Sequence, residues 1–330
     1  MASQRIFGFL ASAIADGAFP ATAEQAREAQ ERHVDSVAVT ILLEQLLLRT
    51  ADLLQRQNIE FRVLKGPAYA RICYPVPAVR SFGDIDLLVR SSDFDAAAAV
   101  LAGTGAHRRF PEPRPGFDRR FGKGACFVLP DGLELDLHRT FVSGPFGLTV
   151  DLPALFATVT EFEIDGCALR ALGPEERVVG ACFHAVLGKA VPRLVSLRDL
   201  AQMLLNEQID TGRVRELAAA WRCEIVVAAA VVASWARFEL DPVPLSAWAD
   251  EFEPDRHDLD RLNLYAGGNR SYARQSIASI RAIHGVRDKL SYVQAITVPQ
   301  RLAQDRTLLS RWRRGLKAIG RRQHRVGQRD

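Results

Sequence analysis

Cysteine is scarce in this 330-residue chain, and its spacing excludes two kinds of site. A disulfide framework has an even number of cysteines, and a zinc site has them closely spaced with histidine. The chain has five cysteines and no Cys-x-x-Cys pair: Cys73, Cys126, Cys167, Cys182 and Cys223. We therefore expect free thiols in a reducing compartment, which predicts a cytoplasmic location.

Long apolar runs are also missing. The longest run beyond the amino-terminal segment, Ile225 to Ala233, falls well short of the ~20 residues of a membrane-spanning helix. Near the start, Arg5 precedes a short apolar run as in a secretory leader, but Gly8 and Ser12 interrupt the run and Asp16 ends it. The chain lacks a glycine-rich P-loop, an internal repeat and a coiled-coil heptad. These absences disfavour secreted, membrane-spanning and P-loop proteins.

Negative charge is nearly absent from one segment, residues 311–330. Its eight Lys and Arg residues and one acid give +7, so the net charge of +4 leaves −3 on the rest of the chain. Such a basic tail favours contact with RNA, an anionic membrane surface or an acidic partner, or it is a solvated terminus.

Two aspartates stand at alternate positions of a strand-like run, DIDLLV. Alternate side chains of a strand share a face, so Asp84 and Asp86 are predicted to lie together, with Ile85 and Leu87 on the other face. Two carboxylates ~4 Å apart repel by about 4 kcal/mol at an effective dielectric of ~20. We therefore expect a cation between them, and a divalent metal is the simplest choice.

A second acidic strand is predicted at LELDLH, residues 133–138. Glu134, Asp136 and His138 alternate there with leucines and so share a face. If this strand lies beside the first, one of its acids completes a carboxylate trio able to hold two Mg²⁺ or Mn²⁺ ions. We choose Asp136 as the third metal ligand. Whether Glu134 also contacts metal stays open.

Candidate phosphate contacts precede the acidic pair. A strand-like run over residues 60–64 ends at Lys65-Gly66, and Pro67 suits the first turn of a following helix. Gly66 lets a backbone or phosphate approach closely. Arg80 has the fork geometry to bind phosphate oxygens, or else forms a structural salt bridge to one of the aspartates. His138 is assigned to substrate contact or to orienting a carboxylate.

The remaining pattern predicts an α+β protein. Apolar spacing over residues 22–57 indicates two helices, the second long. Strand-like pieces near residues 107–110, 125–129 and 133–141 predict a meander, and residues 161–172 a hairpin around Asp165-Gly166. The basic loop over residues 111–124 either covers a substrate or is a surface loop. From Pro174 to about Arg314 the chain reads as helical.

These motifs resemble a known family. LKG, a following Tyr and Pro, Arg80, DIDLLV and the later Asp136-x-His138 strand look like the uncharacterised nucleotidyltransferase family of the polymerase-beta-like superfamily. The resemblance covers residues 59–138 and extends loosely over residues 180–205. It implies that Gly66 lies in the phosphate-side turn and that Asp84, Asp86 and Asp136 bind metal. Pro67 departs from the family pattern, which usually has Ser after the glycine.

The organisation expected is an amino-terminal helical segment (1–58), a small mixed-sheet catalytic core (59–172), a helical region beside the nucleotide (173–310) and a basic tail (311–330). The expected activity is Mg²⁺- or Mn²⁺-dependent transfer of a nucleoside monophosphate from a nucleoside triphosphate, ATP among them, to an unidentified small-molecule, protein or RNA acceptor. An inactive nucleotidyltransferase fold that binds nucleotide, RNA or a partner protein is the alternative. A glycosyltransferase could use the Asp-x-Asp pair, but that reading explains neither Lys65-Gly66 nor the second acidic strand.

Overall fold

A seven-stranded mixed sheet forms the centre of the protein in a computed structural model that describes residues 5–266 and 271–298. Its strand order is β3-β4-β5-β2-β1-β7-β6. The strands are β1 (Phe61–Val63), β2 (Ile85–Val89), β3 (His107–Arg108), β4 (Gly124–Val128), β5 (Glu134–His138), β6 (Val159–Ile164) and β7 (Cys167–Leu172). The pairs β2–β5 and β1–β7 are parallel and the other four are antiparallel. The predicted small mixed sheet is confirmed.

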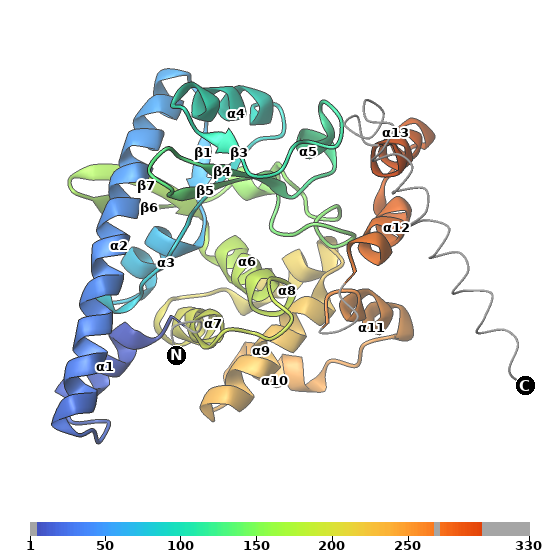
Figure 1. The fold of residues 1–330 in the computed structure, drawn as a ribbon. Helices are drawn as coiled ribbons and strands as arrows, with labels where there is room; N and C mark the ends of the chain where they lie inside the picture. The colour runs from blue at the N-terminus through green and yellow to red at the C-terminus, as the bar shows by residue number, and fades with distance from the viewer. Residues whose placement is uncertain (1–4, 267–270, 299–330) are drawn as a thin grey trace, which may run out of the picture.

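Two helices precede the sheet, and the longer one corrects a prediction. α1 (Phe7–Ala15) packs against α2 (Ala23–Arg56), which runs along one side of the molecule (Figure 1). The sequence indicated two helices over residues 22–57, whereas α2 is one helix of 34 residues. Thr22 caps its start through a reciprocal pair of hydrogen bonds with Gln25. No Gly or Pro lies between its ends, so nothing in the sequence breaks it.

The connections around β2 position the site. After β1, helix α3 (Lys65–Cys73) begins with a kink at Gly66, whose φ of 42° and ψ of −113° suit glycine. A 3₁₀ turn, η2 (Pro77–Val79), then leads to β2. α4 (Phe94–Gly103) and the short α5 (Phe117–Arg120) flank the predicted meander β3-β4-β5, which is confirmed.

The predicted hairpin and helical region are also present. A second 3₁₀ turn, η3 (Ala154–Phe156), precedes the hairpin β6–β7, which turns at Asp165 and Gly166, both at positive φ as a tight two-residue turn requires. The helices that follow are α6 (Pro174–Leu187), α7 (Leu194–Asn206), α8 (Thr211–Ala220), α9 (Glu224–Phe238), α10 (Pro244–Glu251), α11 (Arg256–Asn263), α12 (Tyr272–Ala282) and α13 (Val286–Thr297). The tail over residues 311–330 lies outside the described residues.

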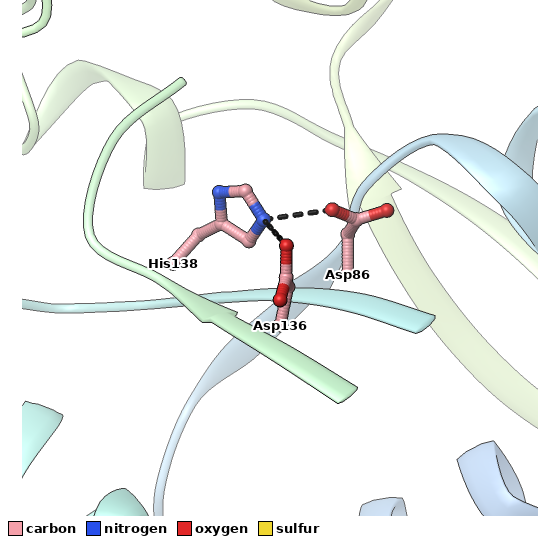
Figure 2. Close-up of side chains that lie close together, drawn as sticks. All are labelled: Asp86, Asp136 and His138. Carbon is pink, nitrogen blue, oxygen red and sulfur yellow. Dashed lines mark hydrogen bonds and ion pairs between the residues drawn. The ribbon is translucent and has the colours of Figure 1, made fainter. Parts of the chain in front are cut away.

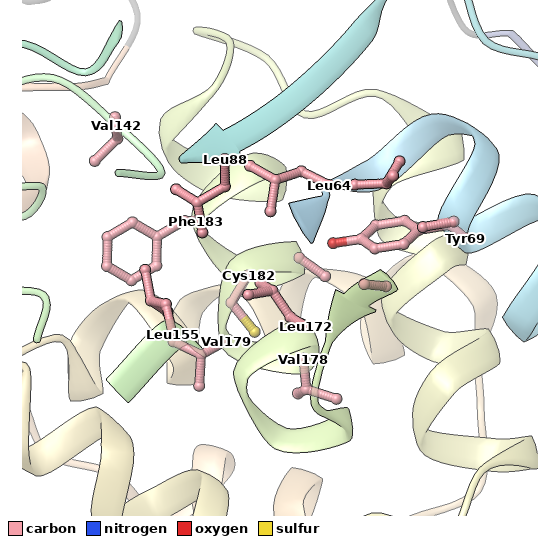
Figure 3. Packing of buried hydrophobic residues seen from close by; sticks show 14 of the residues in the cluster. Leu64, Tyr69, Leu88, Val142, Leu155, Leu172, Val178, Val179, Cys182 and Phe183 are labelled. Carbon is pink, nitrogen blue, oxygen red and sulfur yellow. The ribbon is translucent and has the colours of Figure 1, made fainter. Parts of the chain in front are cut away.

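One large apolar cluster joins the sheet to these helices. Its members run from Leu43 on α2 to Tyr265 after α11. Figure 3 shows part of it, where Leu64 and Leu88 from the sheet region meet Phe183 and Val179 of α6. A second, smaller cluster joins α5 to α12 and α13: Phe117, Phe121, Ile283, Tyr292 and Ala295. No helix among residues 5–266 and 271–298 is long and apolar enough to cross a membrane.

Candidate active site

The two acidic strands lie side by side. β2 and β5 are parallel neighbours with Asp86 directly opposite Asp136. Opposed residues of neighbouring strands point to the same face, so the two carboxylates converge. His138 lies two residues beyond Asp136 and joins them on that face (Figure 2). The strand adjacency assumed from the sequence is therefore present.

Asp86, Asp136 and His138 form a compact group of metal-binding side chains. One ligand atom from each lies within 4.8 Å of the others. His138 Nε2 is 2.7 Å from Asp86 Oδ1 and 3.9 Å from Asp136 Oδ2. His138 Nδ1 is 3.2 Å from the carbonyl oxygen of Thr140, which only accepts hydrogen bonds, so we assign the proton to Nδ1.

That assignment suits a cation at Nε2. Burial and the charge of Lys123 lower the pKa of His138, although its interaction with Asp86 opposes the shift. In a neutral ring with the proton on Nδ1, the Nε2 lone pair faces the carboxylate of Asp86. A cation between them would attract both the Nε2 lone pair and the carboxylate. A hydrogen bond from Nδ1 to a backbone carbonyl is also the usual arrangement of a metal-binding histidine. The residues present therefore fit a divalent ion.

Lys65 holds the buried carboxylate of Asp86. The backbone N–H of Leu64 donates to the carbonyl oxygen of Asp86, which fixes the end of β1 beside β2. The chain then turns sharply at Lys65 and Gly66, and Lys65 Nζ lies 2.7 Å from Asp86 Oδ1. Burial opposes ionisation of Asp86, but the charge of Lys65 holds the pKa of this carboxyl well below its usual value. Asp86 is therefore an anion.

Asp84 and Asp136 each have a basic neighbour that motif reasoning did not assign to the site. Asp84 lies just before β2, and its Oδ1 is 3.2 Å from Nη1 of Arg5. Lys123 Nζ is 3.7 Å from Asp136 Oδ2. The sequence placed Lys123 in a basic loop that either covers a substrate or lies on the surface, and only the pairing of β4 with β5 shows which carboxylate it reaches.

These side chains line a cavity of about 350 Å³. Its charged lining is mainly cationic, because Lys189 and Arg193 add to the basic residues already named, while Asp84 and Asp136 are its acids. The aromatic residues Phe141, Phe183 and Tyr265 also line it. A cavity lined by cationic and aromatic side chains suits a ligand that carries phosphates and a ring.

The comparison with protein families decides the assignment. The model of a family described as uncharacterised nucleotidyltransferase matches residues 1–236. The chain belongs to this nucleotidyltransferase family. Its mixed sheet is the fold expected of such a protein. No curated protein matches the chain.

Solved nucleotidyltransferases show distant similarity to this family member. The antibiotic-resistance factor ANT(2'')-Ia is 15% identical over 59% of this chain and 94% of its own, with a TM-score of 0.39. The lincosamide antibiotic adenylyltransferase LnuA is 11% identical over 48% of this chain and 95% of its own, with a TM-score of 0.33. An antigenic nucleotidyltransferase-like protein from Paracoccidioides brasiliensis is 16% identical over 57% and 92%, with a TM-score of 0.31.

Arg80, predicted to contact phosphate, lies outside the cavity of this nucleotidyltransferase-family protein. It is not among the described residues that line the cavity. Its guanidinium is buried and makes two hydrogen bonds to Asp199 of α7, at 3.1 and 2.6 Å. Of the two interpretations offered by the sequence, the geometry is that of a salt bridge, but the partner is Asp199 rather than Asp84 or Asp86. Arg80 has no free N–H fork to offer a phosphate in this structure.

Two other predicted residues lie at the margin. Gly66 is buried, and a side chain there would approach the carbonyl oxygen of Asp84, so it shapes the turn that carries Lys65 without lining the described cavity itself. Glu134 makes an ion pair with Arg109 and is absent from the group formed by Asp86, Asp136 and His138. Of the two acids on β5, Asp136 therefore belongs to the metal-binding group and Glu134 does not.

Proposed function

We propose that this protein is a metal-dependent nucleotidyltransferase that moves a nucleoside monophosphate from a nucleoside triphosphate to an acceptor hydroxyl or phosphate. An acceptor oxygen bonds to the α-phosphorus, the bond from that phosphorus to the bridging β-phosphate oxygen breaks, and pyrophosphate leaves. The observation that carries the proposal is the in-register pair of Asp86 and Asp136, joined by His138, because Asp136 and His138 line a cavity that also has several cationic side chains.

We assign the divalent ion, Mg²⁺ or Mn²⁺, to Asp86 and Asp136, with His138 beside them and with Asp84 in the lining of the cavity that Asp136 and His138 also line. When bound, such an ion neutralises phosphate charge and positions the acceptor and the leaving group. The remaining roles fall to the side chains. Asp136 is the more exposed of the paired carboxylates, at 29% against 2%, so we place the acceptor on its side.

The basic residues would bind the phosphates. Lys65 and Lys123 each lie beside a carboxylate that the ion would also bind. Once the ion neutralises these carboxylates, each ammonium group could interact with an incoming phosphate. The aromatic residues of the lining would hold a nucleoside or the acceptor by stacking and exclude water from it. Arg80 is left out of this scheme because its guanidinium is already paired with Asp199.

The test separates Asp136 from Glu134. The purified full chain would be given each nucleoside triphosphate with Mg²⁺ or Mn²⁺ and a pool of candidate acceptors, and pyrophosphate release would be measured. We expect Asp136→Asn to abolish the chemical step while still binding nucleotide, and Glu134→Gln to retain most activity. Nucleotide binding without turnover under every condition would instead favour the inactive binding protein. Full activity of Asp136→Asn would contradict the proposed site.

A further inference from the structure

Arg5 reaches the site from outside the predicted catalytic core. It precedes α1, yet its guanidinium lines the cavity and makes an ion pair with Asp84. It therefore touches a residue 79 positions away that lies at the entrance to β2. No motif in the first 58 residues indicated that this segment would contribute to the site.

Close packing around Gly83 and helix α1 positions Arg5. A Cβ at Gly83 would lie 2.8 Å from Nη2 of Arg5, so the guanidinium would have to shift from this position if a larger residue stood there. Helix α1 is fixed just as closely, because a Cβ at Gly8 would lie 2.3 Å from the carbonyl oxygen of Val79. Phe9 packs against the ring of Tyr74 at 5.4 Å between centroids. These contacts hold Arg5 over Asp84.

A second guanidinium belongs to the same cavity lining. Arg193, directly before α7, lines the cavity with Arg5 and Asp84. Burial lowers the pKa of Arg193, the charge of Arg5 lowers it further, and Asp84 opposes the shift. Lys189 also lines this cavity. Its lining thus has more cationic than anionic side chains, and an anionic ligand would balance the excess positive charge.

We propose that Arg5 and Arg193 form a clamp for the two phosphate groups that leave as pyrophosphate, and that Arg5 moves from Asp84 to phosphate when substrate binds. Guanidinium groups bind phosphate oxygens through two parallel N–H donors, and a pair of them matches a multiply charged group. The inference rests on the proposed function. It adds that the segment around α1 is part of the active site.

Binding measurements test the clamp without requiring turnover. Isothermal titration of the full chain with tripolyphosphate and Mg²⁺ would be compared with titration by AMP, which lacks the leaving phosphates. We expect Arg5→Gln and Arg193→Gln each to weaken tripolyphosphate binding by about 10-fold or more, since each removes charge-assisted hydrogen bonds to phosphate oxygens. AMP binding should change by less than about threefold. Arg5→Lys should recover part of the loss.

Arg198→Gln is the matched control. Arg198 lies on α7, is exposed and stacks on Phe9 of α1, but it is absent from the described lining of the cavity. Its loss should leave tripolyphosphate affinity unchanged, although it removes a contact with α1. Wild-type affinity in both Arg5→Gln and Arg193→Gln, or an equal loss for AMP, would overturn the clamp alone. A wild-type chain that binds neither tripolyphosphate nor nucleotide would overturn the proposed function with it.

Discussion

Each carboxylate of the candidate site lies next to a cationic side chain from a different segment. Asp84 pairs with Arg5, Asp86 with Lys65, and Asp136 lies near Lys123. The repulsion expected between neighbouring acids is therefore partly balanced by the chain itself. Alternation along the strands predicted which acids share a face, but it could not predict which long basic side chains reach them, because those come from segments distant in sequence.

This pairing predicts different stability effects for the first two aspartates. Asp86→Asn leaves Lys65 without its buried counter-charge and should lower the free energy of unfolding by about 2–4 kcal/mol. Asp84→Asn should lower it by less than about 1 kcal/mol, because that carboxylate is 38% exposed. Denaturant unfolding of both variants without added metal checks the difference. Equal stabilities, or a gain for Asp86→Asn, would show that repulsion between the acids dominates.

His184 should make the protein sensitive to acid. It lines the cavity, and burial, followed by the charge of Lys65, lowers its pKa well below the usual value of 6.5. Below that pH the unfolded chain takes up a proton that the folded chain resists, so stability falls as pH falls. We expect His184→Gln to flatten the loss in melting temperature between pH 7.5 and 5.5. His257→Gln, on the surface of α11, serves as the control and should keep the wild-type slope.

Among the elements, α7 is tied to the loop before β2 by one buried ion pair. Arg80 and Asp199 are 4% and 1% exposed, and Tyr74 also donates to Asp199. Removing either charge leaves the other buried and unpaired. The Arg80→Met and Asp199→Leu variants should each lose about 3–5 kcal/mol of stability, and the double variant should lose clearly less than their sum.

A double-mutant cycle on this pair gives the coupling energy directly. The exposed pair of Arg213 and Glu216 on α8 is the control and should couple by less than about 0.5 kcal/mol. A coupling energy for Arg80 and Asp199 as small as that of the surface pair would mean that this ion pair contributes little to the free energy of unfolding. It would also return Arg80 to consideration as a phosphate ligand.

The local sequence predicted which segments form helices and which form strands, but often not where each one begins and ends. The turn residues Asp165-Gly166 predicted the hairpin, and strand-like pieces predicted the meander, which are both present. The single helix α2 was predicted as two, because exposed apolar residues such as Val34 and Ile41 disturb its periodicity. The order of strands across the sheet also lay beyond local patterns, since it depends on contacts between distant segments.

At the scale of the whole molecule, the main apolar cluster extends across the predicted divisions at residues 58 and 172. Those divisions remain predictions about chain organisation. We expect the part from α2 to α10 to unfold in one cooperative transition. The small cluster between α5 and α12–α13 is separate, so these two helices should open first. Amide hydrogen exchange checks this, with faster exchange expected in α12 and α13 than in α6 and α9; uniform rates would contradict it.

The burial of most thiols has a practical consequence for spectroscopy. Cys73, Cys182 and Cys223 are buried, and burial raises the pKa of the half-buried Cys126 to about 12. Cys167, beside the turn of the β6–β7 hairpin, is exposed. Because maleimide dyes react with accessible thiolates, a fluorophore should attach at this hairpin in the unmodified chain. The natural sequence thus offers an attachment point at the β6 edge of the sheet, with the acidic strands nearer the middle.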